Sequence, residues 1–257
     1  MIFFDFLRFL ALISAIFSFL VWTAFLRILF GYGEFSQRWV DFCAKIHSRL
    51  GFFILLVDRR HTATPTSQLR PSLMVSNHLS YLDVLTISAD YACSFVTSVE
   101  IRDSFLLGHM AKLFGCVFVE RRDRSQIDKE IGSIAESIKN GRTVCIFPEA
   151  TSSNGEQVLP FKKSMFKSVS GTGIPVHAFS LKYSHKKGGP LNSQERDAVC
   201  WYGDMPFLPH LWACIRLRGF LSSYEDLGYI ETTDLSRDEL CETAFAKVSA
   251  KYHNILL

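Results

Sequence analysis

The hydrophobic pattern divides the chain into an apolar N-terminal part and a longer part built of short alternating segments. Phe9 to Leu26 is a run of 18 residues without a charge, bounded by Arg8 and Arg27. A helix over this run covers roughly 27 Å, nearly the thickness of a hydrocarbon core. A cleavable signal peptide would have a shorter apolar core and a small-residue cleavage site. The run therefore favours a retained membrane anchor, with a buried core helix as the alternative.

The next segment, Phe35 to Val57, mixes basic residues with aromatic and aliphatic residues at helical spacing. This pattern predicts an amphipathic helix that lies on the membrane interface rather than a second span. Basic residues are frequent after the anchor, and such residues mark the cytoplasmic side of a membrane protein. We therefore expect everything downstream to face the cytoplasm. The basic residues in question are Arg27, Arg38, Lys45, Arg49, Arg59 and Arg60.

A polar, proline-containing stretch separates these helices from the rest of the chain. Residues 61–72 read HTATPTSQLRPS, a composition typical of a linker. We expect two parts: membrane-anchoring helices in residues 1–60 and a catalytic α/β domain in residues 61–257.

From residue 73 onward, short apolar runs alternate with longer segments of helical period. The expected strands are Leu73–Ser76, Ser94–Ser98, Cys116–Val119, Thr143–Phe147, Pro175–Lys182 and Asp197–Tyr202. The expected helices are Tyr81–Ala89, Arg102–Phe114, Ser125–Lys139, Phe161–Val169 and one near His210–Arg216. Such alternation predicts a single α/β domain with a mixed, largely parallel central sheet flanked by helices. Ligands of such sheets bind beyond the carboxyl ends of the strands.

Composition excludes several classes of protein. Hydrophobic residues make up 48% of the chain and charged residues 21%, so it is neither disordered nor fully embedded in a membrane. A net charge of +3, without a basic stripe, gives no reason to expect nucleic acid as a partner. The seven cysteines are an odd number and include no C-x-x-C pair, so neither a metal site nor a disulfide framework is expected. A reducing, cytosol-facing location follows.

The sharpest local feature is the sequence from Asn77 to Asp83. His78 follows a predicted strand, and Ser80 is a good N-cap for the next helix. From the first helical turn, Asp83 can reach back to the imidazole. A carboxylate bound to one ring nitrogen fixes the tautomer and leaves the other nitrogen able to accept a proton. The substrate's own hydroxyl can then be the nucleophile, because no G-x-S-x-G elbow surrounds Ser80. The alternative is a core histidine and an unrelated surface carboxylate.

A second feature follows the apolar strand that ends near Phe147. Glu149 stands there in a polar turn, where it can orient the hydroxyl groups of an acceptor, or it can be an ordinary solvated carboxylate. Lys162 and Lys163 come at the start of the next predicted helix, where cations oppose the helix dipole. An anionic ligand at this terminus would relieve the conflict, so Lys162 is a candidate contact for a phosphate or acceptor. A solvated lysine pair is the commoner explanation.

A third feature is a group of arginines after the strand that ends at Val119. The planar fork of arginine suits a phosphate better than the ammonium of lysine does. Glu120 and Asp123 partly neutralise the group. For Arg122 and Arg124 a solvent-facing charge run is the better explanation, and Arg121 is the candidate ligand.

These features occur in an order that resembles the four sequence blocks of the glycerolipid acyltransferase family, which includes the 1-acylglycerol-3-phosphate acyltransferases. The resemblance covers roughly residues 70–230. The matching blocks are His78 with Asp83, Gly115-x-x-Phe118-x-x-Arg121, Phe147-Pro148-Glu149-x-Thr151, and Ile174-Pro175-Val176. The family also implies a pair of N-terminal membrane-associated helices.

The resemblance implies a role for each block. His78 is the general base and Asp83 holds it in place, while Arg121 contacts a phosphate or headgroup. Glu149 and Thr151 position the acceptor. No metal or prosthetic group is implied, since acyl-CoA or acyl carrier protein brings the acyl group as a co-substrate. The supporting positions are Asn77, Ser80, Gly115, Phe118, Pro148 and Pro175.

Two departures from the family pattern concern the acceptor. The usual glycine and arginine of the third block are Ala150 and Ser152 here, and the second proline of the fourth block is replaced near His177. Loss of the arginine removes a phosphate ligand. We therefore expect transfer of a fatty acyl chain to the hydroxyl of 1-acylglycerol-3-phosphate or a related lysophospholipid, with a lysolipid such as lyso-ornithine lipid as the alternative acceptor.

Two other classes of function compete with acyl transfer. In a thioesterase or lipase, water would replace the lysolipid, but the chain has no serine elbow. A membrane-anchored lipid or acyl-carrier binding module would use the same apolar and basic surfaces, yet it would not need a histidine paired with an acid.

Overall fold

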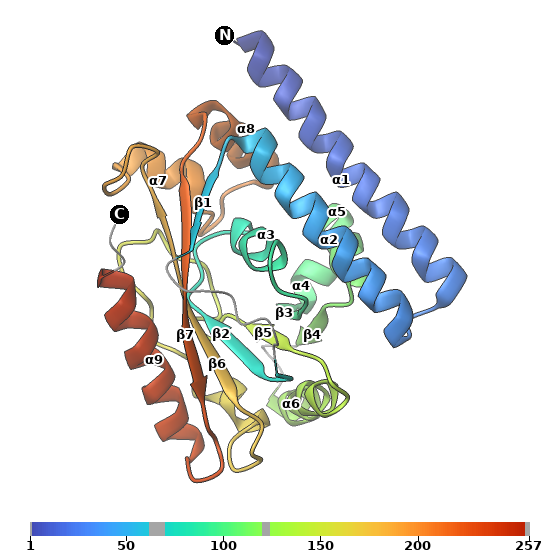
Figure 1. The fold of residues 1–257 in the computed structure, drawn as a ribbon, viewed down its shortest axis with the longest axis vertical. Coiled ribbons are helices and arrows are strands. Elements are labelled where there is room, and N and C mark those ends of the chain that lie inside the picture. Colours follow the sequence, from blue (N-terminus) through green and yellow to red (C-terminus); the bar gives the residue numbers. More distant parts are fainter. Residues whose placement is uncertain (1, 62–69, 120–123, 255–257) are drawn as a thin grey trace.

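The central feature of the computed structural model is a seven-stranded sheet (Figure 1). The structure describes residues 2–61, 70–119 and 124–254. The strand order is β1-β7-β6-β2-β5-β3-β4, and every neighbouring pair is parallel except the antiparallel pair β6–β7. This confirms the predicted mixed, largely parallel sheet. The strands are β1 Asp58–His61, β2 Leu73–Ser76, β3 Ser94–Ser98, β4 Val117–Val119, β5 Val144–Ile146, β6 Val176–Ser184 and β7 Leu221–Ile230.

Helices cover both faces of the sheet, and the alternation of side chains along each strand explains why. Leu73 and Val75 of β2 pack in the same buried cluster as Ile134, whereas Met74 between them packs with Val40. Successive side chains of a strand point to opposite faces, so both faces need an apolar cover. The helices are α1 Ile2–Phe30, α2 Glu34–Leu55, α3 Leu82–Ser88, α4 Val99–Arg102, α5 Phe105–Phe114, α6 Arg124–Lys139, α7 Ser193–Val199, α8 Phe207–Leu217 and α9 Arg237–Asn254, with the 3-10 helix η1 Lys163–Ser168.

The two N-terminal helices form a hairpin that lies along the rest of the fold (Figure 1). Arg8, near the start of α1, donates hydrogen bonds to the carbonyl oxygens of Ile54 and Ile215, both at 2.8 Å. Arg27, near its end, donates to the carbonyl oxygen of Leu113 at 3.1 Å. Both ends of α1 are thus attached to the body of the protein. The predicted division at residue 60 stays a prediction.

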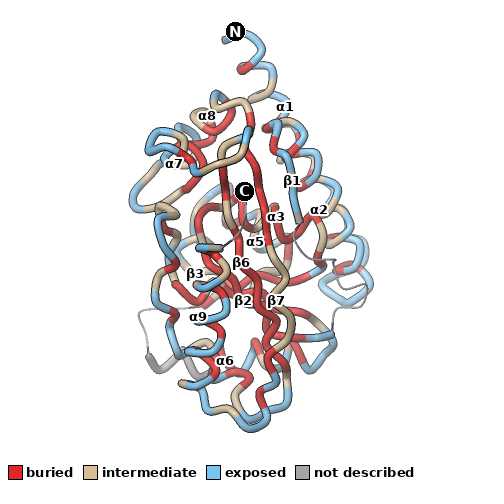
Figure 2. Tube along the Cα trace, turned by 60° about the vertical axis from the view of Figure 1, so that its left-hand side comes forward, coloured by how far each residue is buried: buried red, intermediate tan, exposed pale blue. Residues whose placement is uncertain are grey.

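The outer surface of this hairpin is apolar. By length and composition α1 could cross a membrane, with a mean hydropathy of 2.3 over its most apolar window. In the described part of the chain, every large hydrophobic side chain that stays exposed belongs to residues 2–56, apart from Phe105 and Leu208. Figure 2 shows the same contrast, with the central strands β2 and β6 mainly buried and much of α1 and α2 exposed. Because so much exposed apolar area is rare on a protein in water, the hairpin indicates association with a membrane.

Several predicted elements differ from the observed ones. The predicted strand Asp197–Tyr202 is wrong: this region begins with helix α7, which a capping box of Asn192 and Glu195 starts. The predicted helix Arg102–Phe114 is broken, since the Ser104 hydroxyl accepts a bond from the Gly108 N–H and starts α5 afresh. Of the predicted linker, residues 62–69 lie outside the described residues.

Candidate active site

The predicted site residues gather where the central strands β2 and β5 end, as expected for this type of sheet. His78 lies two residues beyond the end of β2, and Phe147 directly follows β5. The Asn77 side chain fixes the end of β2, because its amide donates to the Leu181 carbonyl at 2.9 Å and accepts from the Leu181 N–H at 2.8 Å. The backbone that carries His78 is therefore held by the neighbouring strand β6.

His78 and Asp83 form a hydrogen-bonded pair. Nδ1 of His78 lies 2.7 Å from Oδ2 of Asp83, and the same oxygen accepts from the N–H groups of Leu79 at 2.6 Å and Ser80 at 3.0 Å. The other oxygen, Oδ1, accepts from the Tyr183 hydroxyl at 2.6 Å. Asp83 is fully buried, whereas the His78 side chain is 23% exposed. Because Nδ1 donates to a carboxylate, Nε2 is the nitrogen left to accept a proton.

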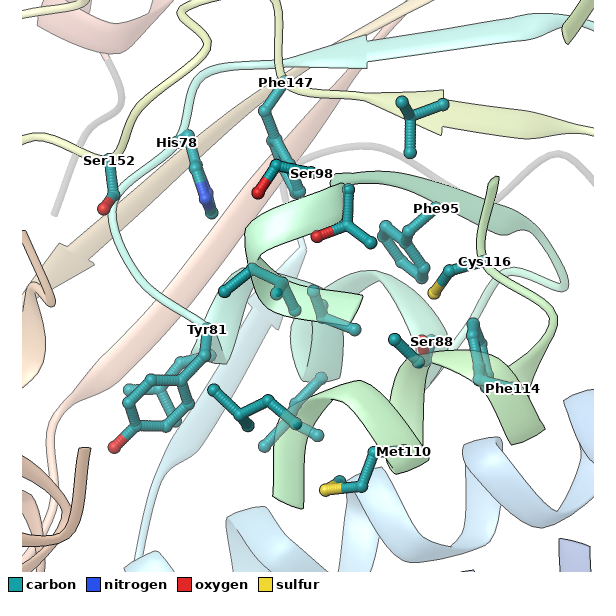
Figure 3. A pocket seen from close by; sticks show the side chains of 18 of the residues that line it. His78, Tyr81, Ser88, Phe95, Ser98, Met110, Phe114, Cys116, Phe147 and Ser152 are labelled. Atoms are coloured by element: carbon teal, nitrogen blue, oxygen red, sulfur yellow. The ribbon is translucent and has the colours of Figure 1, made fainter. Parts of the chain in front are cut away.

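The imidazole plane is fixed by an aromatic stack. The His78 ring lies against the Phe147 ring with a centroid distance of 4.1 Å and an interplanar angle of 11°. Phe147 in turn stacks on Phe95 at 6.2 Å. Figure 3 shows His78 and Phe147 side by side at one end of the pocket. Ring rotation would break both the stack and the bond to Asp83, so the orientation of Nε2 is set in advance.

The prediction that Ser80 caps the following helix is wrong. Helix α3 begins at Leu82, its N-cap position is Tyr81, and no side chain caps it. The Ser80 hydroxyl is buried without a hydrogen-bond partner in the described structure. The Asp83 carboxylate instead reaches back to the N–H groups of Leu79 and Ser80 in the loop before the helix. One carboxylate therefore shapes the loop and holds the imidazole.

Glu149 is turned toward the backbone rather than the cavity. Its Oε1 accepts from the His78 N–H at 2.7 Å, and its Oε2 accepts from the Leu159 N–H at 2.9 Å. The side chain is only 3% exposed, and burial raises the pKa of Glu149 to about 7, although these two bonds act in the opposite direction. Glu149 thus ties the His78 loop to the segment before η1. Its predicted contact with an acceptor stays a prediction.

The turn after Glu149 contains the two positions, Ala150 and Ser152, at which the third block departs from the family pattern. Ala150 has a φ of 61°, the left-handed region that favours the usual glycine. Thr151 is exposed beside the cavity. The hydroxyl of Ser152 donates to the carbonyl oxygen of Trp201. Ser152 therefore holds two loops together and does not replace the charge of an arginine.

The two lysines that the sequence could not separate have different surroundings. Lys163 forms ion pairs with Asp238 at 2.8 Å and Glu242 at 3.8 Å. Lys162 is exposed, lines the cavity and has no ion-pair partner among the described residues, while its N–H donates to the Pro148 carbonyl at 2.8 Å. Of the pair, Lys162 is the one placed to meet an anionic substrate.

The remaining predicted positions lie further from the imidazole. Arg121 lies outside the described residues, so its predicted contact with phosphate stays a prediction. Gly115 ends helix α5 with a φ of 87°. Phe118 is half-buried in β4. Pro175 is buried just before β6, and its carbonyl accepts from the Leu73 N–H at 3.1 Å.

A cavity of about 740 Å³ opens beside His78 and is large enough for a substantial ligand. Its lining is mainly apolar and comes from the N-terminal hairpin, from α3 to α5 and from the loops after β2 and β5. Among the described lining residues there is no aspartate or glutamate, and Lys162 is the only lysine or arginine. Representative apolar lining residues are Leu12, Phe19, Leu85, Phe95, Met110 and Phe114.

Two residues of the site are not among the predicted site residues. Tyr183 lies 100 residues from Asp83 and reaches it only because β6 pairs with β2. Trp201 reaches the His78 loop through its backbone N–H, which donates to the Leu79 carbonyl at 2.9 Å. The pairing of β6 with β2 brings Tyr183 to the site, and a contact between two loops brings Trp201 there.

Comparison with known proteins agrees with this geometry. The model of the Acyltransferase family matches residues 59–182. The lyso-ornithine lipid O-acyltransferase of Brucella abortus (strain 2308) is 30% identical over 232 residues, which cover 86% of this chain and 84% of that protein. The 1-acyl-sn-glycerol-3-phosphate acyltransferase of Neisseria gonorrhoeae is 34% identical over 146 residues, 57% of this chain and 55% of that protein.

A solved structure shows the same fold. The crystal structure of the 1-acyl-sn-glycerophosphate acyltransferase PlsC from Thermotoga maritima superimposes with a TM-score of 0.71 over 98% of this chain and 95% of that one, at 20% sequence identity. The chain belongs to the acyltransferase family and is an O-acyltransferase.

Proposed function

We propose that this enzyme transfers a fatty acyl group from a thioester to the hydroxyl of a lysolipid, with His78 as the general base. The observation that carries the proposal is the 2.7 Å contact between His78 Nδ1 and Asp83 Oδ2 at the wall of a large apolar cavity. The acyl chain suits the apolar lining, and the acyl donor is acyl-CoA or acyl carrier protein loaded with an acyl group. The chemistry needs no further cofactor, because the thioester is already activated.

The proposed reaction moves one proton and exchanges one bond. The acceptor hydroxyl gives its proton to His78 Nε2 while its oxygen attacks the thioester carbonyl. Asp83 stabilises the resulting imidazolium, as in a serine hydrolase triad whose serine has been replaced by the substrate's alcohol. When the C–S bond breaks, the imidazolium returns the proton to the leaving thiolate. The products are an ester and a free thiol.

For the acceptor, we propose lyso-ornithine lipid first and 1-acylglycerol-3-phosphate second. The Brucella relative, which aligns over 84% of its own length, acts by its name on lyso-ornithine lipid. The Ser152 side chain gives no charge to a phosphate at the position where the family pattern has arginine, and Lys162 is the only cation in the described lining. The Neisseria relative supports the phosphate acceptor over a shorter alignment.

The test is acyl transfer by purified protein in detergent micelles to a panel of lysolipids, with products identified by mass spectrometry. We expect His78→Ala to lower the rate by at least about 100-fold, the usual range for losing a general base, while far-ultraviolet circular dichroism stays unchanged. Normal transfer by His78→Ala would show that the mechanism is wrong. Release of free fatty acid without an acceptor would instead indicate a thioesterase.

We also propose that α1 and α2 bind one leaflet from the cytoplasmic side. Buried residues occur from the first turn of α1 to its last, at Asp5, Leu12, Phe19 and Arg27 among others, so the helix lies along the protein over its whole length. A helix that crossed the bilayer would carry α2 and its charged residues into the hydrocarbon core, which is costly. The basic residues on and after α2 suit the anionic surface of the cytoplasmic leaflet.

A further inference from the structure

The cavity wall near His78 contains three aromatic rings that converge from distant segments. Tyr81 comes from the loop after β2, Trp201 from the loop after α7, and Phe207 from the first turn of α8. The Tyr81 centroid lies 5.7 Å from Trp201 and 5.1 Å from Phe207, with interplanar angles of 64° and 67°. All three side chains line the cavity and are partly exposed. The steep angles between the rings make a corner rather than a flat stack.

The polar atoms of this aromatic corner are already bound within the protein. The Tyr81 hydroxyl donates to Nδ1 of His210 at 3.1 Å, and Nε2 of His210 donates to the Cys200 carbonyl at 3.1 Å. Burial lowers the pKa of His210, which keeps this imidazole neutral and able to accept. Nε1 of Trp201 donates to the Met205 carbonyl at 2.8 Å. What remains for a ligand is aromatic carbon surface with its negative π faces.

The aromatic corner adjoins the reacting end of the cavity. The Trp201 backbone is bonded on one side to Leu79, next to His78, and on the other to the Ser152 hydroxyl. Figure 3 shows Tyr81, Ser152 and His78 at one side of the pocket and Phe114 and Met110 at the other. A group bound at the aromatic corner would therefore belong to the acceptor near His78 rather than to the far end of an acyl chain.

We propose that Tyr81, Trp201 and Phe207 bind the ammonium group of a zwitterionic lysolipid acceptor, while Lys162 attracts its carboxylate. A cation is drawn to aromatic faces by their quadrupole, most strongly to tryptophan. Among the described lining residues no carboxylate competes for that ammonium, and Lys162 is the only lysine or arginine. Ornithine is an amino acid with a carboxyl group and a side-chain amine, so a lyso-ornithine headgroup has both charges. This inference rests on the proposed transfer to a lysolipid hydroxyl.

The test compares two acceptors that differ by one charge: lyso-ornithine lipid with a free side-chain amine, and the same lipid with that amine acetylated. We expect wild-type protein to have a kcat/KM about 5-fold or more higher for the free amine. Trp201→Leu keeps apolar bulk but removes the ring, so it should abolish this preference. Trp201→Phe should keep most of it. Both variants lose the hydrogen bond from the indole N–H to the Met205 carbonyl, so a difference between the two variants reports on the aromatic ring alone.

Trp212→Leu provides the matched control. Trp212 packs edge-to-face on Phe9 with a centroid distance of 5.8 Å and is not part of the described cavity lining, so this variant should keep the wild-type preference. Equal losses for both acceptors in Trp201→Leu would overturn the ammonium site and assign the rings to the acyl chain. Transfer to 1-acylglycerol-3-phosphate but to neither ornithine acceptor would overturn it as well, while leaving the role of His78 intact.

A binding measurement separates this inference from the proposed reaction. Affinities of His78→Ala protein for the two ornithine lipids can be measured by calorimetry in the same micelles, without turnover. Tighter binding of the free amine that Trp201→Leu abolishes would support the ammonium site even if the chemistry of His78 proved different. Equal binding of the two lipids would overturn the site.

Discussion

At the scale of single residues, the site depends on one buried carboxylate that serves several donors at once. Asp83 accepts from His78, from two backbone N–H groups and from the Tyr183 hydroxyl. A buried carboxylate with this many donors keeps its geometry, because loss of any one donor leaves a lone pair unsatisfied. Burial and the neighbouring charge of Asp83 raise the pKa of Tyr183, so the phenol stays protonated and remains a donor.

We predict that Tyr183→Phe lowers kcat/KM by about 10-fold or more, since a hydrogen bond to a charged group contributes roughly 1.5–3 kcal/mol. Without the Tyr183 hydroxyl, the Asp83 carboxylate is held less firmly and orients the imidazole less well. Tyr224→Phe is the control, because it removes a tyrosine bond to another carboxylate, Asp90, away from His78. An unchanged kcat/KM in Tyr183→Phe would assign Tyr183 to packing alone.

Glu149 gives a second prediction at this scale, in the dependence of stability on pH. Burial raises the pKa of Glu149 from 4.5 to about 7. The folded state then binds the proton of Glu149 more tightly than the unfolded chain does. Proton binding therefore adds its full amount to the free energy of unfolding below about pH 4.5, and this amount is lost as the pH rises to about 7. The loss amounts to about 3 kcal/mol. In urea unfolding at pH 4.5 and 7.5, the free energy of unfolding should fall by about 3 kcal/mol more in wild type than in Glu149→Gln. Equal changes in the two proteins would contradict it.

At the scale of elements, the junction between helix α5 and strand β4 explains why the second sequence block starts with glycine. Gly115 has a φ of 87°, and a Cβ atom there would lie 2.6 Å from Oε1 of Gln37 and 3.1 Å from Nη2 of Arg27. Both partners belong to the N-terminal hairpin, and Arg27 is itself hydrogen-bonded to Ser36 and Gln37. The glycine thus lets α5 end against the hairpin that forms part of the cavity wall.

We predict that Gly115→Ala lowers the free energy of unfolding by about 1–3 kcal/mol, because it combines a left-handed backbone with a steric clash. Gly132→Ala in α6 is the matched control. A Cβ atom at Gly132 would meet nothing within 4 Å, and the position is helical. That substitution should raise the free energy of unfolding by about 0.5–1 kcal/mol. Equal effects of the two substitutions in chemical denaturation would show that the contact with Gln37 is unimportant.

At the scale of the whole molecule, the N-terminal hairpin is apolar on the side that lines the cavity and on its outer side. Leu12, Ala15 and Phe19 of α1 and Gly51 and Leu55 of α2 line the same cavity as His78. The outer faces of the two helices are the exposed apolar surface. The two helices thus present apolar side chains both to the outside and to the cavity, which suits an enzyme acting on membrane lipids.

The proposed arrangement on one leaflet predicts where both termini lie. Protease-sensitive tags placed before Met1 and after Leu257 should be removed together when protease is added to inverted membrane vesicles, whose cytoplasmic face is outside. A helix α1 that crossed the bilayer would protect the N-terminal tag while the C-terminal tag is cut. Detergent-permeabilised vesicles provide the control, since both tags should be cut there.

The amino-acid sequence by itself determined the features that depend on neighbours along the chain. Alternation of apolar runs predicted most strands and the parallel sheet, and five residues of separation were enough to pair His78 with Asp83. The apolar run of α1 and the mixed pattern of α2 predicted the hairpin's helices. Local periodicity failed for α7, where a capping box decided the structure, and for β7, whose polar residues hide a strand that pairs with β6 and β1.

Only the tertiary structure decided which distant side chains meet. Tyr183 reaches Asp83, Glu149 turns to the His78 backbone, and Lys162 rather than Lys163 remains beside the cavity. Trp201 comes close to Leu79 from another loop. The physical reason is that strand register and helix packing bring together residues far apart in sequence, and no local pattern of polarity encodes which of them will touch.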